Sequence, residues 1–171
     1  CCTNLIDLYD RLGVGDLIDW HSVLYWTRGQ GVIDTMKAGW LPAPLHLSGS
    51  MRKMRLLDRG ANGHLRRAVI RLIRRGAKGR YRYRDRTFAE FLEECGQPPE
   101  VIADFWNTII VSACNLDVNR VGAVPALQVF QDGFLANRWS YTMGLPAVPL
   151  AALYDPSVPM IEDAGGEVNL G

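Results

Sequence analysis

The sequence predicts an α+β fold that is mostly helical and has a few short strands. Apolar residues recur every three or four positions in several segments, most extensively over residues 101–113, as on the buried face of a helix. Residues 21–27 differ, because they are rich in valine, tyrosine and tryptophan. The turn-like residues 28–31 and the apolar pair Val32 and Ile33 follow, so this region predicts a β-hairpin. With 171 residues, 48% of them apolar and 22% charged, the chain has enough material for one domain with a core.

The first half of the chain contains two predicted helices separated by a rigid segment. The first helix is expected from Asn4, a residue type that caps helix N-termini, to Leu12, with Gly13 ending it. Residues 41–45 contain two prolines, which fix two φ angles and remove two hydrogen-bond donors. We expect a rigid apolar connector there, followed by a helix from Met51 onward.

The second half is predicted to be helical with a strand at its end. Thr87 and Glu90 fit the capping-box pattern at a helix start, and Gly96 ends that helix. The remaining elements follow from the same signals: a helix over 98–113, a helix over 122–135, an apolar connector over 143–150, a short helix from Asp155 and a strand over 167–170.

Composition excludes several classes of protein. No stretch approaches the roughly 18 uncharged apolar residues of a membrane-spanning helix. The four cysteines lack the spacing of a zinc site, so we expect no metal, and we interpret them as reduced thiols in a cytosolic setting. The chain begins at Cys1 without a methionine or a signal-peptide pattern, and we expect it to be a piece of a longer protein.

The distribution of charge is the clearest functional signal. The net charge is only +1, but 14 of the 19 basic residues lie between Arg52 and Arg86, where the only acids are Asp58 and Asp85. Residues 64–75 within this segment predict a basic amphipathic helix with an apolar stripe. The stripe comprises Leu65, Ala68, Val69, Leu72 and Ile73, and the basic face comprises Arg66, Arg67, Arg71, Arg74 and Arg75.

Three interpretations of this helix stay open. Its stripe could pack on a core with the arginines in solvent, insert into an anionic membrane surface, or accompany a nucleic-acid contact. Residues 80–84 then alternate arginine and tyrosine, as in an exposed strand, a headgroup contact or a stacking platform for bases. The usual glycine-rich nucleotide, zinc-protease and serine-hydrolase motifs do not occur in the sequence. The residues by themselves are therefore compatible with an enzyme or with a binding module.

Five segments taken together resemble one family of flavoproteins. They are residues 1–13, 41–46, 113–120, 127–135 and 144–150, which read CCTNLIDLYDRLG, LPAPLH, ACNLDVNR, LQVFQDGFL and GLPAVPL. In this order they resemble the squalene-associated FAD-dependent desaturases, which include the bacterial hydroxysqualene dehydroxylases, within the amine oxidase and phytoene desaturase group.

The resemblance implies a domain arrangement and a cofactor. Residues 1–20 would form a junction helix beside the flavin, residues 21–160 a helical substrate domain with a membrane-facing segment at 52–86, and residues 161–171 a strand returning to the FAD domain. Gly165 to Val168 resemble that return strand. The FAD-binding unit itself would lie outside this sequence.

The resemblance also implies which residues approach the cofactor and the substrate. The flavin would be approached by Cys1, Cys2, Thr3 and Asn4, although small cysteines are commonly core filler. An apolar tunnel for the substrate would be lined by Tyr25, Trp26, Trp40, Leu41, Pro42, Asn115 and Met143, for which ordinary core packing, or a helix cap at Asn115, is the alternative. The candidates for a proton-donating residue are Asp117, Tyr25, His46 and Asp132.

The function expected from this resemblance is the reductive dehydroxylation of hydroxysqualene to squalene by an FAD enzyme. We expect a lipophilic isoprenoid and a membrane surface as partners, no nucleic acid, and a cytoplasmic location on the inner membrane face, with the five arginines 66, 67, 71, 74 and 75 in contact with the membrane. A carotenoid-type desaturase is the alternative among enzymes. A non-catalytic basic module that binds membrane or nucleic acid is the alternative of another class.

Overall fold

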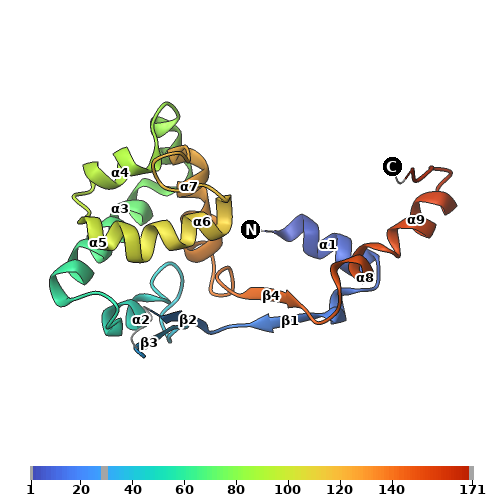
Figure 1. Cartoon of the computed structure of the whole chain (residues 1–171), viewed down its shortest axis with the longest axis horizontal. Coiled ribbons are helices and arrows are strands. Elements are labelled where there is room, and N and C mark those ends of the chain that lie inside the picture. Colours follow the sequence, from blue (N-terminus) through green and yellow to red (C-terminus); the bar gives the residue numbers. More distant parts are fainter. Residues whose placement is uncertain (1, 28–30, 170–171) are drawn as a thin grey trace. The chain divides into compact units, whose positions relative to one another are not determined.

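The computed structural model describes residues 2–27 and 31–169, and this part of the chain is α+β and mostly helical, as predicted (Figure 1). It divides into two compact units. One consists of Ser22–Tyr141, and the other combines the flanking segments before Ser22 and after Tyr141. The predicted substrate domain at 21–160 therefore extends further than the compact unit, because Thr142 and the residues after it belong with the N-terminal segment.

The unit Ser22–Tyr141 begins with the predicted hairpin. Strands β2 (Leu24–Thr27) and β3 (Ile33–Met36) pair antiparallel, with Thr27 opposite Ile33, while residues 28–30 lie outside the described residues. The buried carboxylate of Asp34 accepts hydrogen bonds from the backbone N–H groups of Arg55 and Leu56, both at 2.6 Å. These two hydrogen bonds link the hairpin to residues 55 and 56, which follow α2 (Ser48–Lys53).

The basic segment forms the long helix α3 (Arg59–Gly79), whose N-cap Asp58 accepts a 2.7 Å hydrogen bond from Ala61. Leu65, Ala68 and Leu72 are fully buried in the core of this unit and the half-buried Val69 packs against it, so the core interpretation is confirmed for these residues of the stripe, while Ile73 is half-buried. The helix is interrupted at Gly76, where φ is 60° and ψ is 179°. A 3₁₀ turn, η2 (Arg80–Tyr83), follows the helix.

The alternating arginines and tyrosines of residues 80–84 do not form a strand. In η2, Arg80 and Tyr83 are buried, whereas Tyr81 and Arg82 face solvent. Because a 3₁₀ turn has a period of three residues, Arg80 and Tyr83 lie on the same side. The alternative of an exposed strand was therefore wrong, and the arginines and tyrosines of this segment are divided between the core and the surface.

The rest of the unit is a set of helices around an aromatic core. Helix α4 (Phe88–Glu94) has the predicted capping box, with Thr87 and Glu90 bonded in both directions. The predicted helix over 98–113 consists of α5 (Pro99–Val101), the π-helical turn η3 (Ile102–Asn107) and α6 (Thr108–Cys114). The predicted helix over 122–135 consists of α7 (Ala123–Phe130) and a second π-helical turn, η4 (Gln131–Leu135).

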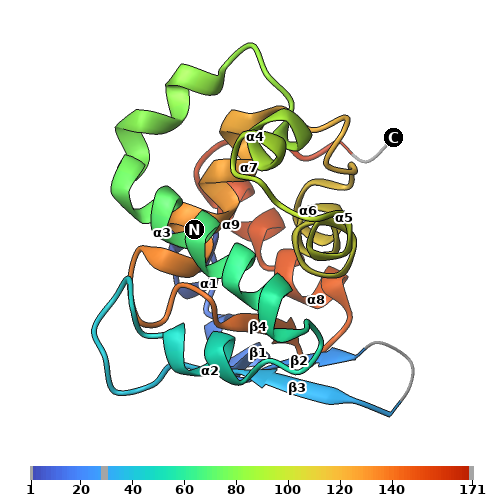
Figure 2. The same cartoon turned by 90° about the vertical axis from the view of Figure 1, so that its left-hand side faces the viewer.

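Aromatic rings hold these helices together. Helices α4 and α7 lie side by side (Figure 2), and Phe88 stacks on Phe130 with ring centroids 5.7 Å apart. Trp106 meets Phe130 edge-on at 4.7 Å and donates from its indole N–H to the side-chain oxygen of Gln97 at 2.9 Å. Offset and edge-on ring pairs add about 0.5–1.5 kcal/mol each beyond the apolar area they bury. This core explains why the 101–113 segment was the strongest helical signal.

The second unit is built from α1 (Thr3–Arg11), the 3₁₀ turn η1 (Gly15–Leu17), β1 (Ile18–His21), β4 (Met143–Pro146), α8 (Leu150–Tyr154) and α9 (Ser157–Asp163). Strands β1 and β4 pair antiparallel, with Ile18 opposite Pro146. The hydroxyls of Tyr9 and Tyr154 lie 2.9 Å apart. Among the described residues of this unit, only Val14 and Leu153 are buried apolar side chains.

Three local expectations in this unit are corrected. The N-cap position of α1 is Cys2, so Asn4 lies inside the first turn and is not the cap. The expected connector over 143–150 is partly strand β4, because it finds a pairing partner in β1. Described residues 165–169 form no strand, since no neighbouring strand of the described chain pairs with them, and Leu170 lies outside the described residues.

Candidate functional site

Described residues of the unit Ser22–Tyr141 line cavities of about 310 and 290 Å³. The first, here called the kink cavity, has a volume of about 310 Å³ and is lined by Ala43, Pro44, Leu72, Ile73, Gly76, Ala77, Gln131, Asp132, Leu135 and Ala136. The second, here called the loop cavity, has a volume of about 290 Å³ and is lined by Gly39, Trp40, Leu41, Leu45, His46, Ser48, Gly49, Arg52 and Arg66.

The kink cavity forms where α3 is interrupted. At Gly76 the backbone leaves the helical conformation, which frees carbonyl oxygens from the helical ladder. The side-chain amide nitrogen of Gln131, from η4, donates to the carbonyls of Leu72 at 3.1 Å and Gly76 at 3.0 Å. The Gln131 side chain therefore supplies hydrogen bonds to the backbone carbonyls at the interruption of α3 and links η4 to α3.

The same glutamine leaves an acceptor unused. Its side-chain oxygen Oε1 is buried and has no hydrogen-bond partner in the described part of the chain. A buried acceptor without a partner costs about 1–3 kcal/mol, and a ligand donor that reached it would recover part of this cost. Most other lining groups are apolar, so the cavity combines apolar walls with a few polar groups, as ligand pockets commonly do.

The acid at the edge of the kink cavity is already paired. Oδ2 of Asp132 accepts a hydrogen bond from Nη1 of the buried Arg80 at 3.1 Å. The geometry gives Asp132 the role of holding Arg80 inside the fold. Whether Asp132 also donates a proton stays a prediction.

The loop cavity is shaped by the proline-containing connector. The N–H of Gly39 donates to the carbonyl of His46 at 2.7 Å, which closes a loop over residues 39–46. Trp40 on this loop is 87% exposed. Arg52 from α2 and Arg66 from α3 complete the lining. The guanidinium group of neither residue makes a hydrogen bond or ion pair within the described chain.

His46 is buried, and it is a poor candidate for proton transfer. Its ring packs beside Tyr141 with centroids 5.9 Å apart, and neither ring nitrogen has a hydrogen-bond partner of good geometry among the described residues. Burial lowers the pKa of His46 from its ordinary value, the charge of Arg138 lowers it further, and the backbone of Phe134 acts in the opposite direction. The ring is therefore held neutral inside the fold.

The structure places each expected substrate residue in its own surroundings. Trp40 and Leu41 both line the loop cavity, which His46 also lines. Tyr25 is 73% exposed on the hairpin, and Trp26 stacks on Phe105 at 5.3 Å as part of the core. Pro42 is exposed on the loop, and Met143 lies on β4 in the other compact unit.

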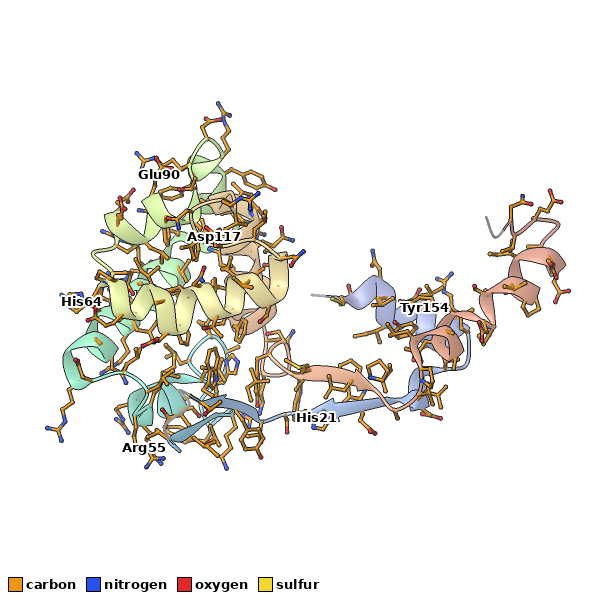
Figure 3. The ribbon with its side chains drawn as sticks, viewed as in Figure 1. His21, Arg55, His64, Glu90, Asp117 and Tyr154 are labelled. Atoms are coloured by element: carbon orange, nitrogen blue, oxygen red, sulfur yellow. The ribbon has the colours of Figure 1, made fainter. Side chains whose placement is uncertain are left out.

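Asn115 and Asp117 have structural roles in the turn between α6 and α7. Asn115 ends α6 in the left-handed conformation, with φ of 53°, which asparagine tolerates better than most residues. Oδ1 of Asp117 accepts a hydrogen bond from the N–H of Asn119 at 2.8 Å, and Figure 3 shows Asp117 in this turn. The alternative of a helix cap is confirmed for Asn115.

The residues expected near the flavin lie at the start of α1. Cys2, Thr3 and Asn4 are exposed there, while Cys1 lies outside the described residues. Their contact with a flavin stays a prediction. Within the described chain, no group of three histidine, cysteine or acidic residues could hold a metal ion. Cys95 and Cys114 form no disulfide within the described part of the chain.

The five arginines expected at a membrane are divided between solvent and internal contacts. Arg66, Arg67 and Arg74 are exposed. Arg71 donates to the carbonyl of Glu94 at 2.8 Å, and Arg75 pairs with the carboxylate of Glu94 at 3.1 Å. None of the helices in the described part of the chain is long and apolar enough to span a membrane. Because the apolar stripe of α3 is buried, it is not free to insert among acyl chains.

Sequence reasoning missed the residues that build the kink cavity. Gly76 was detectable, because a glycine inside a helical pattern indicates a break. Gln131 gave no local signal, since its partners lie on another helix. No family model matches the chain, and no curated protein matches it. The functional argument therefore depends on the resemblance seen in the sequence and on the cavities.

Proposed function

We propose that this chain is the helical substrate-binding part of a flavin-dependent oxidoreductase that converts hydroxysqualene to squalene. The proposal combines the family resemblance with one structural observation. The kink cavity has largely apolar walls and one buried acceptor without a partner, Oε1 of Gln131. An apolar chain with a single hydroxyl offers the matching donor.

The fit would place the hydroxyl-bearing part of the substrate in the kink cavity. The hydroxyl would donate to Gln131, and the adjoining hydrocarbon would pack on Leu72, Ile73 and Leu135. With about 310 Å³, the cavity is at the lower end of ligand pockets, so we expect it to hold one part of the C30 chain. The protein's contribution would be to orient the hydroxyl and exclude water from it.

The connection between the units also supports the proposal. The chain leaves β1 just before the unit Ser22–Tyr141 and returns into β4 just after it, and these strands pair antiparallel. The helical unit is thus inserted between two adjacent strands. The resemblance implies the same arrangement, in which a helical substrate domain is inserted into a flavin domain.

The alternatives receive less support. A carotenoid-type desaturase would act on a hydrocarbon without a hydroxyl, which would leave Oε1 of Gln131 unpaired in the complex. A nucleic-acid module would use the residues 80–84, but Arg80 and Tyr83 are buried. We therefore favour the hydroxylated substrate and propose no nucleic-acid partner.

We propose that the enzyme works on the cytoplasmic face of the inner membrane, where its isoprenoid substrate dissolves. The buried stripe of α3 leaves the arginine face as the available contact. Each exposed basic residue near an anionic surface contributes about 1 kcal/mol. The contact would be peripheral and electrostatic.

The test is the reaction itself, carried out with the complete protein from the reading frame that contains this sequence. The purified protein is reduced anaerobically and given hydroxysqualene, and squalene is followed by mass spectrometry. The reaction exchanges a hydroxyl for hydrogen and releases water, so squalene is the expected product. Formation of no squalene by a protein that binds flavin would overturn the proposed reaction and favour the desaturase.

A matched pair of variants tests the kink cavity as the site. Ala136→Phe places a ring at the cavity, whereas Ala113→Phe places one on the exposed face of α6. We expect Ala136→Phe to lower kcat/KM by at least about tenfold and Ala113→Phe to leave it unchanged. Equal values for the two variants would place the substrate elsewhere.

A further inference from the structure

We propose that the loop cavity binds the phosphate of an anionic phospholipid headgroup, with Arg52 and Arg66 as its ligands. This inference rests on the membrane contact of the proposed function and deepens it by naming a site and a lipid class. It concerns a cavity distinct from the kink cavity, with none of its lining residues in common.

The charges of the loop cavity are the first argument. Arg52 and Arg66 come from two different helices, and no hydrogen bond or ion pair within the described chain occupies either guanidinium. Among the described residues, none that lines the cavity is acidic. By contrast, Arg75 and Arg80 pair with Glu94 and Asp132. Two unpaired guanidinium groups at one cavity favour a phosphate, which each can bind with two parallel hydrogen bonds.

The shape and the smaller polar groups of the cavity suit a headgroup. Its volume of about 290 Å³ is large enough for a phosphate with its attached glycerol. Ser48 contributes a hydroxyl that makes no hydrogen bond in the described chain, so it remains available as a donor. Gly49 beside it adds no side chain that would narrow the cavity.

The apolar rim favours a lipid over a soluble anion. Trp40 is 87% exposed and Leu45 is 49% exposed, and both belong to the loop that the Gly39–His46 hydrogen bond closes. Tryptophan is enriched at membrane interfaces, where its ring lies at the level of the headgroups. A soluble phosphate would leave both side chains in water. A headgroup in the cavity would bring them against the bilayer, where they lose apolar exposure.

The test compares two arginine pairs that carry the same charge change. Arg52→Gln with Arg66→Gln removes the cavity ligands, whereas Arg67→Gln with Arg74→Gln removes two exposed arginines of α3 outside the cavity. Binding of the full-length protein to vesicles of phosphatidylcholine with phosphatidylglycerol is measured by co-sedimentation. At about 0.5 M salt, exposed charges are largely screened. We expect the cavity pair to lower vesicle affinity at least about tenfold more than the control pair.

A second comparison separates the lipid from a soluble anion. We expect Trp40→Ala to weaken vesicle binding, and Tyr81→Ala, which removes an exposed ring from η2, to leave it unchanged. Glycerol 3-phosphate at millimolar concentration should not displace the vesicles. Equal losses from the two arginine pairs would overturn the cavity as the site. Displacement by glycerol 3-phosphate with no effect of Trp40→Ala would reassign the cavity to a soluble phosphate.

Folding and catalysis are monitored separately. Thermal unfolding midpoints of all variants should match that of the parent, since every substituted residue is exposed. Vesicle binding needs no substrate and no turnover. If no squalene forms but the two arginine pairs still differ in vesicle binding, the proposed reaction alone is overturned. If squalene forms but the two arginine pairs weaken vesicle binding equally, the headgroup site alone is overturned.

Discussion

His46 shows how burial changes the role of a residue that the sequence offers for catalysis. A histidine is a natural candidate for proton transfer because its ordinary pKa lies near neutral pH. Here burial and the charge of Arg138 lower that pKa, and the ring packs beside Tyr141. The residue therefore contributes a neutral, packed ring, and its effect is expected in stability rather than in turnover.

The protein should lose stability in acid through His46. The unfolded chain takes up a proton below its histidine pKa near 6.5, whereas the folded ring, with a lowered pKa, does not. The free energy of unfolding should therefore fall as pH drops through 6.5, by at most about 1.4 kcal/mol per pH unit from this group. Urea unfolding from pH 7.5 to 5 measures the slope. His46→Gln should make the free energy of unfolding less dependent on pH, whereas His21→Gln, on β1, should leave the dependence as it is. An unchanged slope in His46→Gln would contradict the role of His46 in the loss of stability.

Gln131 has two functions in one side chain. Its nitrogen donates to the carbonyls of Leu72 and Gly76, and its oxygen is a buried acceptor without a partner in the described chain, which we propose as the acceptor for the substrate hydroxyl. A leucine at this position would fill a similar volume but would leave both carbonyls without that donor. The structural and proposed binding roles can therefore be separated only by measuring stability as well as turnover.

We expect Gln131→Leu to destabilise the fold by about 1–3 kcal/mol, since buried acceptors lose their donor. The control is Gln128→Leu on the exposed face of α7, for which we expect a change within about 0.5 kcal/mol. Urea unfolding of the two variants and the parent measures the difference. Equal free energies of unfolding for Gln131→Leu and the parent would show that water replaces the lost donor at the carbonyls of Leu72 and Gly76.

At the scale of elements, α3 combines a regular amphipathic helix with a break. Its first four turns bury an apolar stripe, and Gly76 then adopts a conformation that residues with a side chain avoid. The break turns the chain toward η2, where Arg80 reaches Asp132. The break at Gly76 thus forms part of the wall of the kink cavity and directs the chain to the position of a partly buried ion pair.

Replacing either of two glycines of α3 by alanine should change the free energy of unfolding, in opposite directions for the two positions. Gly76→Ala forces a side chain into a backbone with φ of 60°, and we expect a loss of about 1–3 kcal/mol. Gly63→Ala lies in regular helix with nothing within 4 Å of the added carbon, and we expect a gain of about 0.5–1 kcal/mol. Thermal or urea unfolding measures both. A stabilising Gly76→Ala would mean that α3 can continue through this position.

At the scale of the whole molecule, the two units differ in how much core they contain. The unit Ser22–Tyr141 holds the aromatic cluster of Phe88, Trp106 and Phe130. The other unit buries only Val14 and Leu153 among its described apolar residues, while α1 and α9 expose theirs. Because buried apolar area is the main source of stability, the units should differ in local stability.

Hydrogen exchange should reveal this difference. We expect amides of α6 and α7 to exchange only through global unfolding, and amides of α1 and α9 to exchange through local opening at least about a hundredfold faster. Exchange followed by mass spectrometry on the chain of 171 residues measures it. Equal protection in both units would show that the flanking segments have a covered core of their own.

The sequence alone determined the elements whose signals are local. The capping box of α4, the β2–β3 hairpin and the apolar stripe of α3 follow from residue types and spacing, because neighbours in sequence determine caps, turns and periodicity. The interruption of α3 at Gly76 also has a local signal, because a glycine within a helical pattern is visible in the sequence.

Only the tertiary structure decided what covers each apolar face and which distant residues meet. The stripe of α3 has the same spacing whether a membrane or a core covers it, and packing assigned it to the core. Likewise, Gln131 meets Leu72 because helices far apart in the chain pack together. Arg52 and Arg66 line one cavity because the consecutive helices α2 and α3 pack against each other. Periodicity defines which side of an element is apolar, but the partner of that side is selected by the packing of the whole unit.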